Sequence, residues 1–223
     1  MEGKTFSIGQ ALSVGWKATT ERIWYWIGVL IVGGIIAVLP AVLSSFLNER
    51  EASIGSVFAL IGYVLQIGIA IGVLRISLMT VDGKKPTFGE LFSGFKDAKT
   101  FGRYVLAAIL VGLMVMVGLI LLVVPGVVAS MKYGFYGYAV VDKNVTAMQA
   151  IKISGLATKG NMWNIFLFVL IACGLAMLGM IPLGLGLFLV LPTLTIAQAY
   201  IYRQLSAGVQ VPTAPAMPAA PRV

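Results

Sequence analysis

The sequence predicts an all-α polytopic membrane protein with six transmembrane helices. Hydrophobic residues make up 59% of its 223 residues and charged residues only 11%, whereas a soluble domain carries about 25% charged residues. Long apolar runs recur along the chain, and a bilayer is the solvent that such runs require. The chain has no histidine and a single cysteine, which argues against haem or zinc ligation and excludes a disulfide within the chain. We therefore expect no cofactor and no metal.

Six apolar segments qualify as spans. A helix rises about 1.5 Å per residue and the hydrocarbon core is about 30 Å thick. We expect spans at residues 23–43, 54–79, 104–124, 126–141, 163–180 and 182–202. The fourth reaches only about 24 Å, so either it tilts little or its Pro125-Gly126 turn lies below the lipid surface.

The distribution of charge orients these spans. The connections that follow even-numbered spans share one side with both termini, and that side holds 15 of the 16 Lys and Arg residues. The other side carries only Glu49, Arg50 and Glu51. Because cytoplasmic loops are rich in Lys and Arg, both termini are predicted to be cytoplasmic. No cleavable signal peptide is expected in residues 1–22, which lack a compact apolar core before a cleavage site.

An internal repeat divides the chain into three units. Identical residues recur at a constant offset in the pairs Gln10 and Gln149, Ala11 and Ala150, Ala18 and Ala157, Thr19 and Thr158, and Trp24 and Trp163. A fainter third copy begins at Thr87. The units cover about 7–86, 87–145 and 146–205 within a single membrane domain, residues 1–205. The Pro- and Ala-rich tail, 206–223, is predicted to be a disordered cytoplasmic end.

Each unit opens with a capping box, in which a hydroxyl residue precedes Gln or Glu by three positions and satisfies backbone donors at a helix start. The boxes are Ser7 with Gln10, Thr87 with Glu90, and Thr146 with Gln149. They predict three short cytoplasmic helices at residues 7–20, 87–100 and 146–160. Two spans separate successive copies, so all three helices fall on the same side.

The short helices carry an amphipathic pattern. Apolar residues recur at helical spacing and lysines occupy the polar side, an arrangement that lies flat at headgroup depth and favours anionic lipid. The alternative is that these helices are only elbows that steer the chain into each span. The candidate interfacial residues are Trp16, Lys17, Phe95, Lys96, Lys152 and Lys159.

Each even-numbered span also carries one cation, and Lys132, Arg75 and Arg203 are the candidate contacts for an anion or a lipid headgroup. Lys132 lies nearest the bilayer middle, where an unpaired cation costs at least about 2.5–3.5 kcal/mol. No acid lies inside a span to pair with it, so we expect its side chain to point into the protein or a polar cavity. The alternative for Lys132 is that its side chain snorkels to the membrane surface. Arg75 is also close enough to the surface to snorkel, and we expect Arg203 to do so because it lies at a span end.

The chain resembles a family of six-span bacterial inner-membrane proteins related to YciC, and also the membrane domain attached to some glycerophosphodiester phosphodiesterases. The residues that carry the resemblance are QALSVGWKATTERIWYWIG, GKKPTFGELFSGF, LLVVPGVVASMKYGFYGYAVVDKNVTAMQAIKIS, ATKGNMWNIF and AQAYIYRQL. The resemblance implies a six-span topology in a bacterial inner membrane. It implies no known chemistry, and the phosphodiesterase activity is not carried over because that domain is not attached here.

The residues favour a non-enzymatic scaffold or accessory subunit that contacts lipids or partner membrane proteins. The sequence contains no Walker loop, dinucleotide fingerprint or serine elbow. The alternative is a small transporter or channel for an anion or an amphiphilic solute, with intramembrane cations lining the path. A third hypothesis, an interfacial lipid-modifying enzyme, lacks candidate catalytic residues. Anionic lipids on the cytoplasmic face are the expected partners. The net charge of +8 is attributed to cytoplasmic loops and not to nucleic-acid binding.

Overall fold

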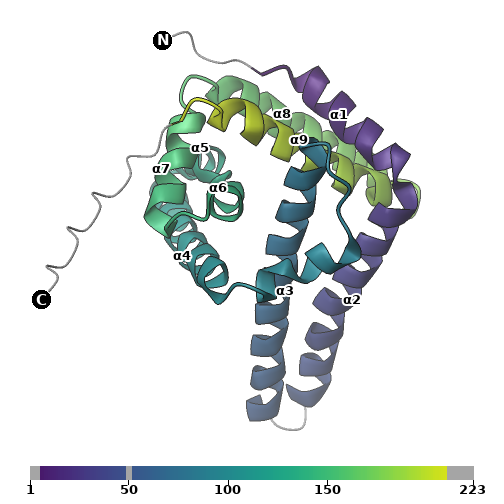
Figure 1. The fold of residues 1–223 in the computed structure, drawn as a ribbon. Helices are drawn as coiled ribbons and strands as arrows, with labels where there is room; N and C mark the ends of the chain where they lie inside the picture. The colour runs from purple at the N-terminus through teal and green to yellow at the C-terminus, as the bar shows by residue number, and fades with distance from the viewer. Residues whose placement is uncertain (1–5, 49–51, 210–223) are drawn as a thin grey trace, which may run out of the picture.

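The computed structural model describes residues 6–48 and 52–209, and their regular secondary structure is helical (Figure 1). The all-α class is confirmed for these residues. Residues 49–51 of the predicted outer connection and most of the predicted tail, 210–223, lie outside the described residues. In chain order the helices are α1 Ile8–Glu21, α2 Ile23–Asn48, α3 Ala52–Val81, the 3₁₀ helix η1 Phe88–Phe95, α4 Ala98–Leu121, α5 Val123–Tyr133, α6 Tyr136–Lys143, α7 Ala147–Ala157, α8 Met162–Met180 and α9 Leu187–Ser206.

Four of these helices are long and apolar enough to cross a membrane, and the chain is accordingly a membrane protein. They are α2 over Ile23–Leu47, α3 over Ser53–Val81, α4 over Ala98–Leu121 and α8 over Met162–Met180. Exposed Ile, Leu, Val and Phe side chains cover much of their surface. An apolar surface of this kind is stable against lipid and costly in water. The four helices coincide with the first, second, third and fifth predicted spans, whereas the count of six and the three repeats stay predictions.

The other two predicted spans take a different form. Segment 126–141 divides into α5 and α6, and α5 already begins at Val123, before the predicted turn at Pro125 and Gly126. In segment 182–202 the helix begins only at Leu187. Much of the second half of α9 is buried by other helices; its residues without exposed surface include Ile196, Ala197, Ala199, Ile201 and Tyr202. Protein side chains rather than lipid therefore surround much of α9.

Each of the three short helices packs on a helix of another predicted unit. Helix α1 lies on α9, η1 lies on α3, and α7 lies on α6 and α5, while α2 and α3 pair as a long hairpin (Figure 1). Small residues permit the close approach: a Cβ added to Gly15 would collide with the Thr193 carbonyl, and one added to Gly72 would collide with the Leu91 carbonyl. The short helices are thus integral to the bundle.

One of the three predicted capping boxes forms completely, and a second forms in half. The Ser7 side chain accepts a hydrogen bond from the backbone N–H of Gln10 at 3.4 Å, and Thr146 and Gln149 form the complete reciprocal box. These contacts satisfy N–H groups that have no partner within the helix, so the sequence located the starts of α1 and α7 correctly.

The prediction of one short helix over residues 87–100 is wrong. Thr87 makes no side-chain cap, and the segment forms the 3₁₀ helix η1, after which α4 begins with Asp97 as its N-cap. The physical reason is a competing partner, because Glu90 lies 3.3 Å from Arg75 of α3 and its carboxylate forms an ion pair there. Glu90, which was predicted to complete a capping box, therefore makes a tertiary contact instead.

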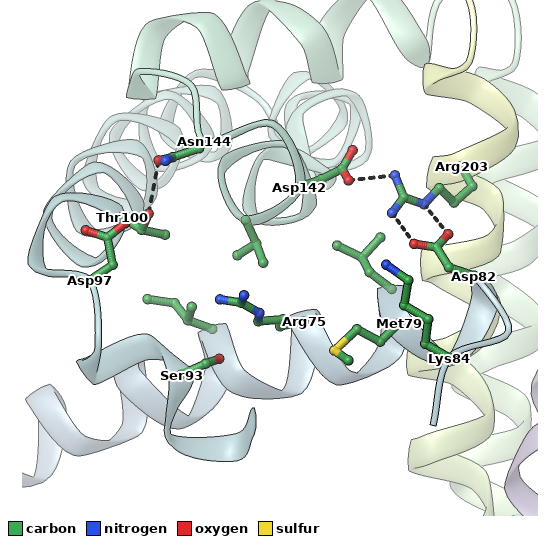
Figure 2. Close-up of a pocket in the computed structure, with 13 residues that line it drawn as sticks. Arg75, Met79, Asp82, Lys84, Ser93, Asp97, Thr100, Asp142, Asn144 and Arg203 are labelled. Atoms are coloured by element: carbon green, nitrogen blue, oxygen red, sulfur yellow. Dashed lines mark hydrogen bonds and ion pairs between the residues drawn. The ribbon is translucent and has the colours of Figure 1, made fainter. Parts of the chain in front are cut away.

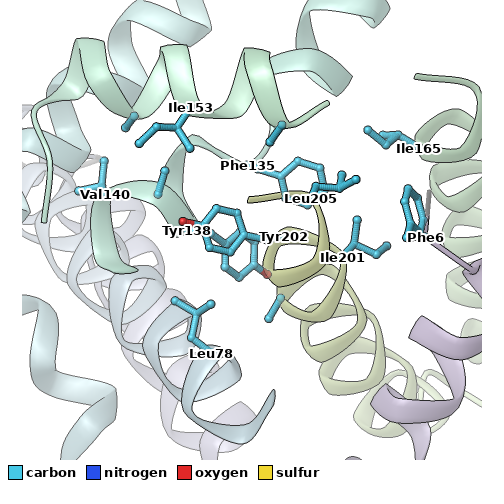
Figure 3. Close-up of a cluster of buried hydrophobic side chains, with 14 of the residues drawn as sticks. Phe6, Leu78, Phe135, Tyr138, Val140, Ile153, Ile165, Ile201, Tyr202 and Leu205 are labelled. Atoms are coloured by element: carbon cyan, nitrogen blue, oxygen red, sulfur yellow. The ribbon is translucent and has the colours of Figure 1, made fainter. Parts of the chain in front are cut away.

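A hydrophobic core lies where α3, α6, α7, α8 and α9 meet (Figure 3). At its centre the rings of Tyr138 and Tyr202 stack with centroids 5.7 Å apart and planes 21° apart. The Tyr138 hydroxyl donates to the Thr195 carbonyl at 3.0 Å, and that of Tyr202 donates to Asp142 at 3.0 Å. Through Asp142, Tyr202 connects this core to the polar cavity described next.

Candidate functional site

A polar cavity of about 440 Å³ lies between α3, η1, α4, α6 and α9 (Figure 2). Its lining combines charged and hydroxyl side chains with a few apolar ones: Ile71, Arg75, Leu78, Met79, Asp82, Lys84, Ser93, Asp97, Thr100, Val141, Asp142, Asn144 and Arg203. Two of the three candidate cations, Arg75 and Arg203, line this cavity. The structure does not bring Lys132 to it.

Arg203 is bound by two carboxylates from different helices. Its Nε and Nη2 donate to the two oxygens of Asp82 at 2.9 and 2.7 Å, and its Nη1 donates to Asp142 at 2.6 Å. The planar guanidinium suits this fork-like pairing. Arg203 thereby ties the ends of α3, α6 and α9 together. Its candidate role as a free contact for an anion is not supported by this geometry, because all three nitrogens donate to carboxylates of the chain.

Arg75 occupies the cavity differently. Its ion pair with Glu90 engages Nε at 3.3 Å, and 53% of its side chain is exposed. Figure 2 shows its guanidinium directed into the cavity. Lys84, from the connection after α3, lines the same cavity, and no hydrogen bond or ion pair joins its ammonium to any residue that the structure describes. Arg75 and Lys84 therefore both face the cavity with N–H donors that no described residue uses.

The rim of the cavity is held by contacts between α4 and α6. Asp97 caps α4 by accepting from the Lys99 backbone N–H at 3.0 Å and from the Thr100 hydroxyl at 2.6 Å. The Thr100 hydrogen bond lowers the pKa of Asp97 below its ordinary value, so the cap stays ionised. Asn144 ends α6 with a left-handed φ of 48°, a conformation that Asn tolerates, and its carbonyl accepts from Arg103 at 2.7 Å.

Lys132 does not line this cavity, and the prediction that its side chain avoids the lipid tails stays untested. Its side chain is exposed, with Nζ 5.4 Å from the centroid of the Tyr133 ring. Its backbone carbonyl, instead, is the group that the fold uses, since it accepts from Ser154 at 2.9 Å and from Thr158 at 3.1 Å. The reason is the end of α5 at Tyr133, where carbonyls lack intrahelical partners and need side-chain donors.

The candidate interfacial residues all lie on the exposed surface: Trp16, Lys17, Phe95, Lys96, Lys152 and Lys159. They belong to α1, η1 with its C-cap, α7 and the turn after α7. Sequence reasoning missed Asp82, Lys84, Ser93 and Asp142 as cavity residues. Asp82 and Asp142 lie at the ends of apolar helices. Both are far from Arg203 in the sequence, so no local pattern predicted their ion pairs with it.

Comparison with known proteins returns distant relatives. The chain is similar to an uncharacterised protein of Mycobacterium bovis, with 23% identity over 235 residues that cover 93% of this chain and 71% of the relative. Uncharacterised proteins from two strains of Mycobacterium tuberculosis match with the same identity and coverage. No protein-family model and no solved structure matches the chain.

Proposed function

We propose that the protein is a non-enzymatic scaffold or accessory subunit of a bacterial inner membrane, with cytoplasmic termini, that contacts anionic lipids. The observation that carries the proposal is the exposure of four lysines on or next to the short helices: Lys17, Lys96, Lys152 and Lys159. Trp16 and Phe95 are exposed beside them, at 52% and 42%. Exposed lysines next to exposed aromatic rings suit helices at headgroup depth.

The connection between α8 and α9 supports the placement of the protein in a bilayer, because this connection is apolar and exposed. Leu183 is 96% exposed and adopts a left-handed φ of 52°, a conformation that costs an ordinary residue about 1–2 kcal/mol. Its neighbours pair their own backbone groups, with the Gly184 N–H bound to the Met180 carbonyl at 3.0 Å and the Leu185 N–H to the Pro182 carbonyl at 2.9 Å. A turn in hydrocarbon must satisfy its backbone internally in this way.

The connection between α4 and α5 has the same character. Leu121, Leu122, Val123 and Val124 are 72%, 68%, 67% and 71% exposed, and the Leu122 N–H donates to the Gly118 carbonyl at 3.0 Å. Measured from Tyr104, α4 reaches about 27 Å by Leu121, slightly less than the hydrocarbon thickness of about 30 Å. Both turns therefore fit the far edge of the hydrocarbon.

A scaffold role is favoured by the contacts that tie the helices together at the centre of the bundle. The Arg203 ion pairs and the stacked rings of Tyr138 and Tyr202 fill the region where α3, α6 and α9 meet. Such a centre holds helices in one arrangement. The alternative, a transporter for an anion or an amphiphile, is favoured by one observation, the cavity lined by Arg75 and Lys84.

We also propose that the chain belongs to the family related to YciC. The resemblance over most of the chain supports it, and so does the coincidence of four apolar helices with four of the predicted spans. The mycobacterial relatives support a bacterial setting.

Lipid preference tests the proposal. Protein purified in maltoside is titrated with phosphatidylglycerol or phosphatidylcholine, and bound lipids are counted by native mass spectrometry. We expect a preference for phosphatidylglycerol that weakens with salt. Changing Lys17, Lys96, Lys152 and Lys159 to Gln removes about 1 kcal/mol of attraction per lysine and weakens the preference, whereas the matched change to Arg retains it.

Two results would contradict the proposal. Equal binding of both lipids by the unaltered protein would remove the anionic contact, and an undiminished preference in the glutamine variant would remove the lysines from it. Protein-dependent flux of phosphate or of a short-chain phospholipid across proteoliposomes would favour the transporter instead.

A further inference from the structure

The polar groups of the cavity divide into those that the chain already uses and those that it leaves available. Asp82 and Asp142 are both engaged by Arg203, and Asp97 is engaged as the α4 cap. All three carboxylates of the cavity therefore have donors, and Arg203 has acceptors for each of its three nitrogens. None of these groups is free for a ligand.

The groups left available are all donors. Arg75 uses Nε for Glu90, which leaves its two terminal amino groups facing the cavity (Figure 2). The Lys84 ammonium has no hydrogen bond or ion pair within the described part of the chain, and Figure 2 shows it directed toward the same space. A cavity whose free groups are two cations is matched by an oxyanion.

Ser93 adds an independent observation. The residue is 4% exposed, and its hydroxyl has no hydrogen-bond partner among the described residues. Buried polar groups are nearly always paired, so an unpaired one calls for a specific explanation. Ser93 lines the cavity, where an acceptor on a ligand would satisfy its hydroxyl.

We propose that the cavity binds a phosphate group held by Arg75, Lys84 and Ser93, carried by a lipid headgroup or by a free phosphate. The volume of about 440 Å³ exceeds that of a phosphate ion, and apolar Ile71 and Leu78 line part of it, which suits a phosphate attached to a less polar group. The proposal goes beyond the surface contact of the short helices, because it concerns one stoichiometric site within the bundle.

Binding of two probes tests the proposal. Inorganic phosphate and dihexanoyl phosphatidylglycerol are each titrated into the full-length protein in maltoside and followed by calorimetry. We expect saturable binding of at least one probe with one site per chain, weakened about tenfold or more in Arg75→Gln and in Lys84→Gln. Lys85→Gln is the matched control, since Lys85 is exposed next to Lys84 and does not line the cavity; its binding stays unchanged.

Ser93→Ala separates a ligand contact from a structural role. Removing an unpaired buried hydroxyl raises the melting temperature of the ligand-free protein, yet the same variant binds the probe more weakly. A Ser93→Ala variant that melts lower and binds equally well would remove Ser93 from the site.

The two sources of phosphate give different results. Binding of inorganic phosphate that competes with the lipid indicates that the phosphate group suffices, whereas binding of the lipid alone indicates a headgroup site. The proposal is overturned if neither probe saturates, or if Lys84→Gln and Lys85→Gln weaken binding equally, which is the behaviour of diffuse surface charge. The variant with four glutamines on the short helices retains this site, so a failed surface contact and a failed cavity site are distinguishable.

Discussion

Arg203 shows how one side chain can join three helices. It carries the ion pairs to Asp82 and Asp142, while its side chain and that of Asp82 are 31% and 32% exposed. The partial exposure means that solvent screens the pairs, so their contribution lies below that of a fully buried triad.

Arg203→Met leaves both carboxylates without their cation. We expect a loss of about 1–3 kcal/mol, seen as a lower melting temperature in detergent. Arg203→Lys keeps the charge but lacks the planar guanidinium that pairs with both carboxylates, and it should melt between Arg203→Met and the unaltered protein. Lys85→Met, which removes an exposed cation, serves as the control, and identical melting of Arg203→Met and the unaltered protein would contradict the prediction.

Ser154 is a second residue whose importance lies in satisfying backbone groups. Its fully buried hydroxyl accepts from the Phe135 N–H at 3.2 Å and donates to the Lys132 carbonyl at 2.9 Å, across the break between α5 and α6. Ser154→Ala should destabilise the protein by about 1–3 kcal/mol, because both groups lose a partner in a buried setting.

Lys132→Met is the comparison, since the exposed ammonium makes no ion pair among the described residues. Thermal melting should show little change for Lys132→Met and a clear decrease for Ser154→Ala. A larger loss from Lys132→Met would restore the side chain as the important group.

At the scale of elements, the contact between η1 and α3 depends on the absence of a side chain. A Cβ at Gly72 would collide with the backbone carbonyl of Leu91, which cannot rotate away as a side chain can. Gly72→Ala should therefore cost about 1–3 kcal/mol as overpacking and separate η1 from α3.

The control lies in α2, where a Cβ on Gly34 meets nothing within 4 Å. Gly34→Ala should be neutral or slightly stabilising, because Ala is the better helix former. Denaturation of both variants in detergent measures the difference, and equal stability of the two would show that η1 adjusts at no cost.

The turn between α8 and α9 makes a prediction about depth. A nitroxide on Leu183→Cys, in a Cys173→Ser background, should collide more with oxygen than with a water-soluble nickel complex in reconstituted bilayers. The reason is that its neighbours are apolar and its backbone bonds are internal. The same label on Lys96→Cys should show the opposite preference, and strong nickel collision at position 183 would place the turn in water.

At the scale of the whole molecule, the three short helices pack on α9, on α3, and on α5 with α6. Each lies beside a helix from another predicted unit, so the units interlock. The placement of all three short helices on one side of the membrane stays a prediction.

Cysteine labelling tests that placement. In a Cys173→Ser background, a membrane-impermeant maleimide applied outside intact cells should label Asn48→Cys and leave Lys96→Cys unlabelled. Disruption of the cells should make Lys96→Cys reactive. Labelling of position 96 in intact cells would overturn the predicted six-span topology.

Local chemistry let the sequence predict much of the fold. Hydropathy identified α2, α3, α4 and α8, because lipid exposure leaves a continuous apolar run. The capping boxes located the starts of α1 and α7, since such a box uses residues three positions apart. The same local signal failed at Thr87, where Arg75 of α3 attracts Glu90.

The sequence by itself determined that this is a helical membrane protein, and it named Arg75 and Arg203 as candidates because cations in apolar segments are costly. Only the tertiary structure decided what those cations contact. Arg203 lies 121 positions from Asp82 and 61 from Asp142 along the chain, and no pattern of hydropathy encodes such pairings. The cavity likewise depends on how α3, α6 and α9 pack, and the exposure of Lys132 depends on how α5 packs, since burial is a property of the assembled bundle.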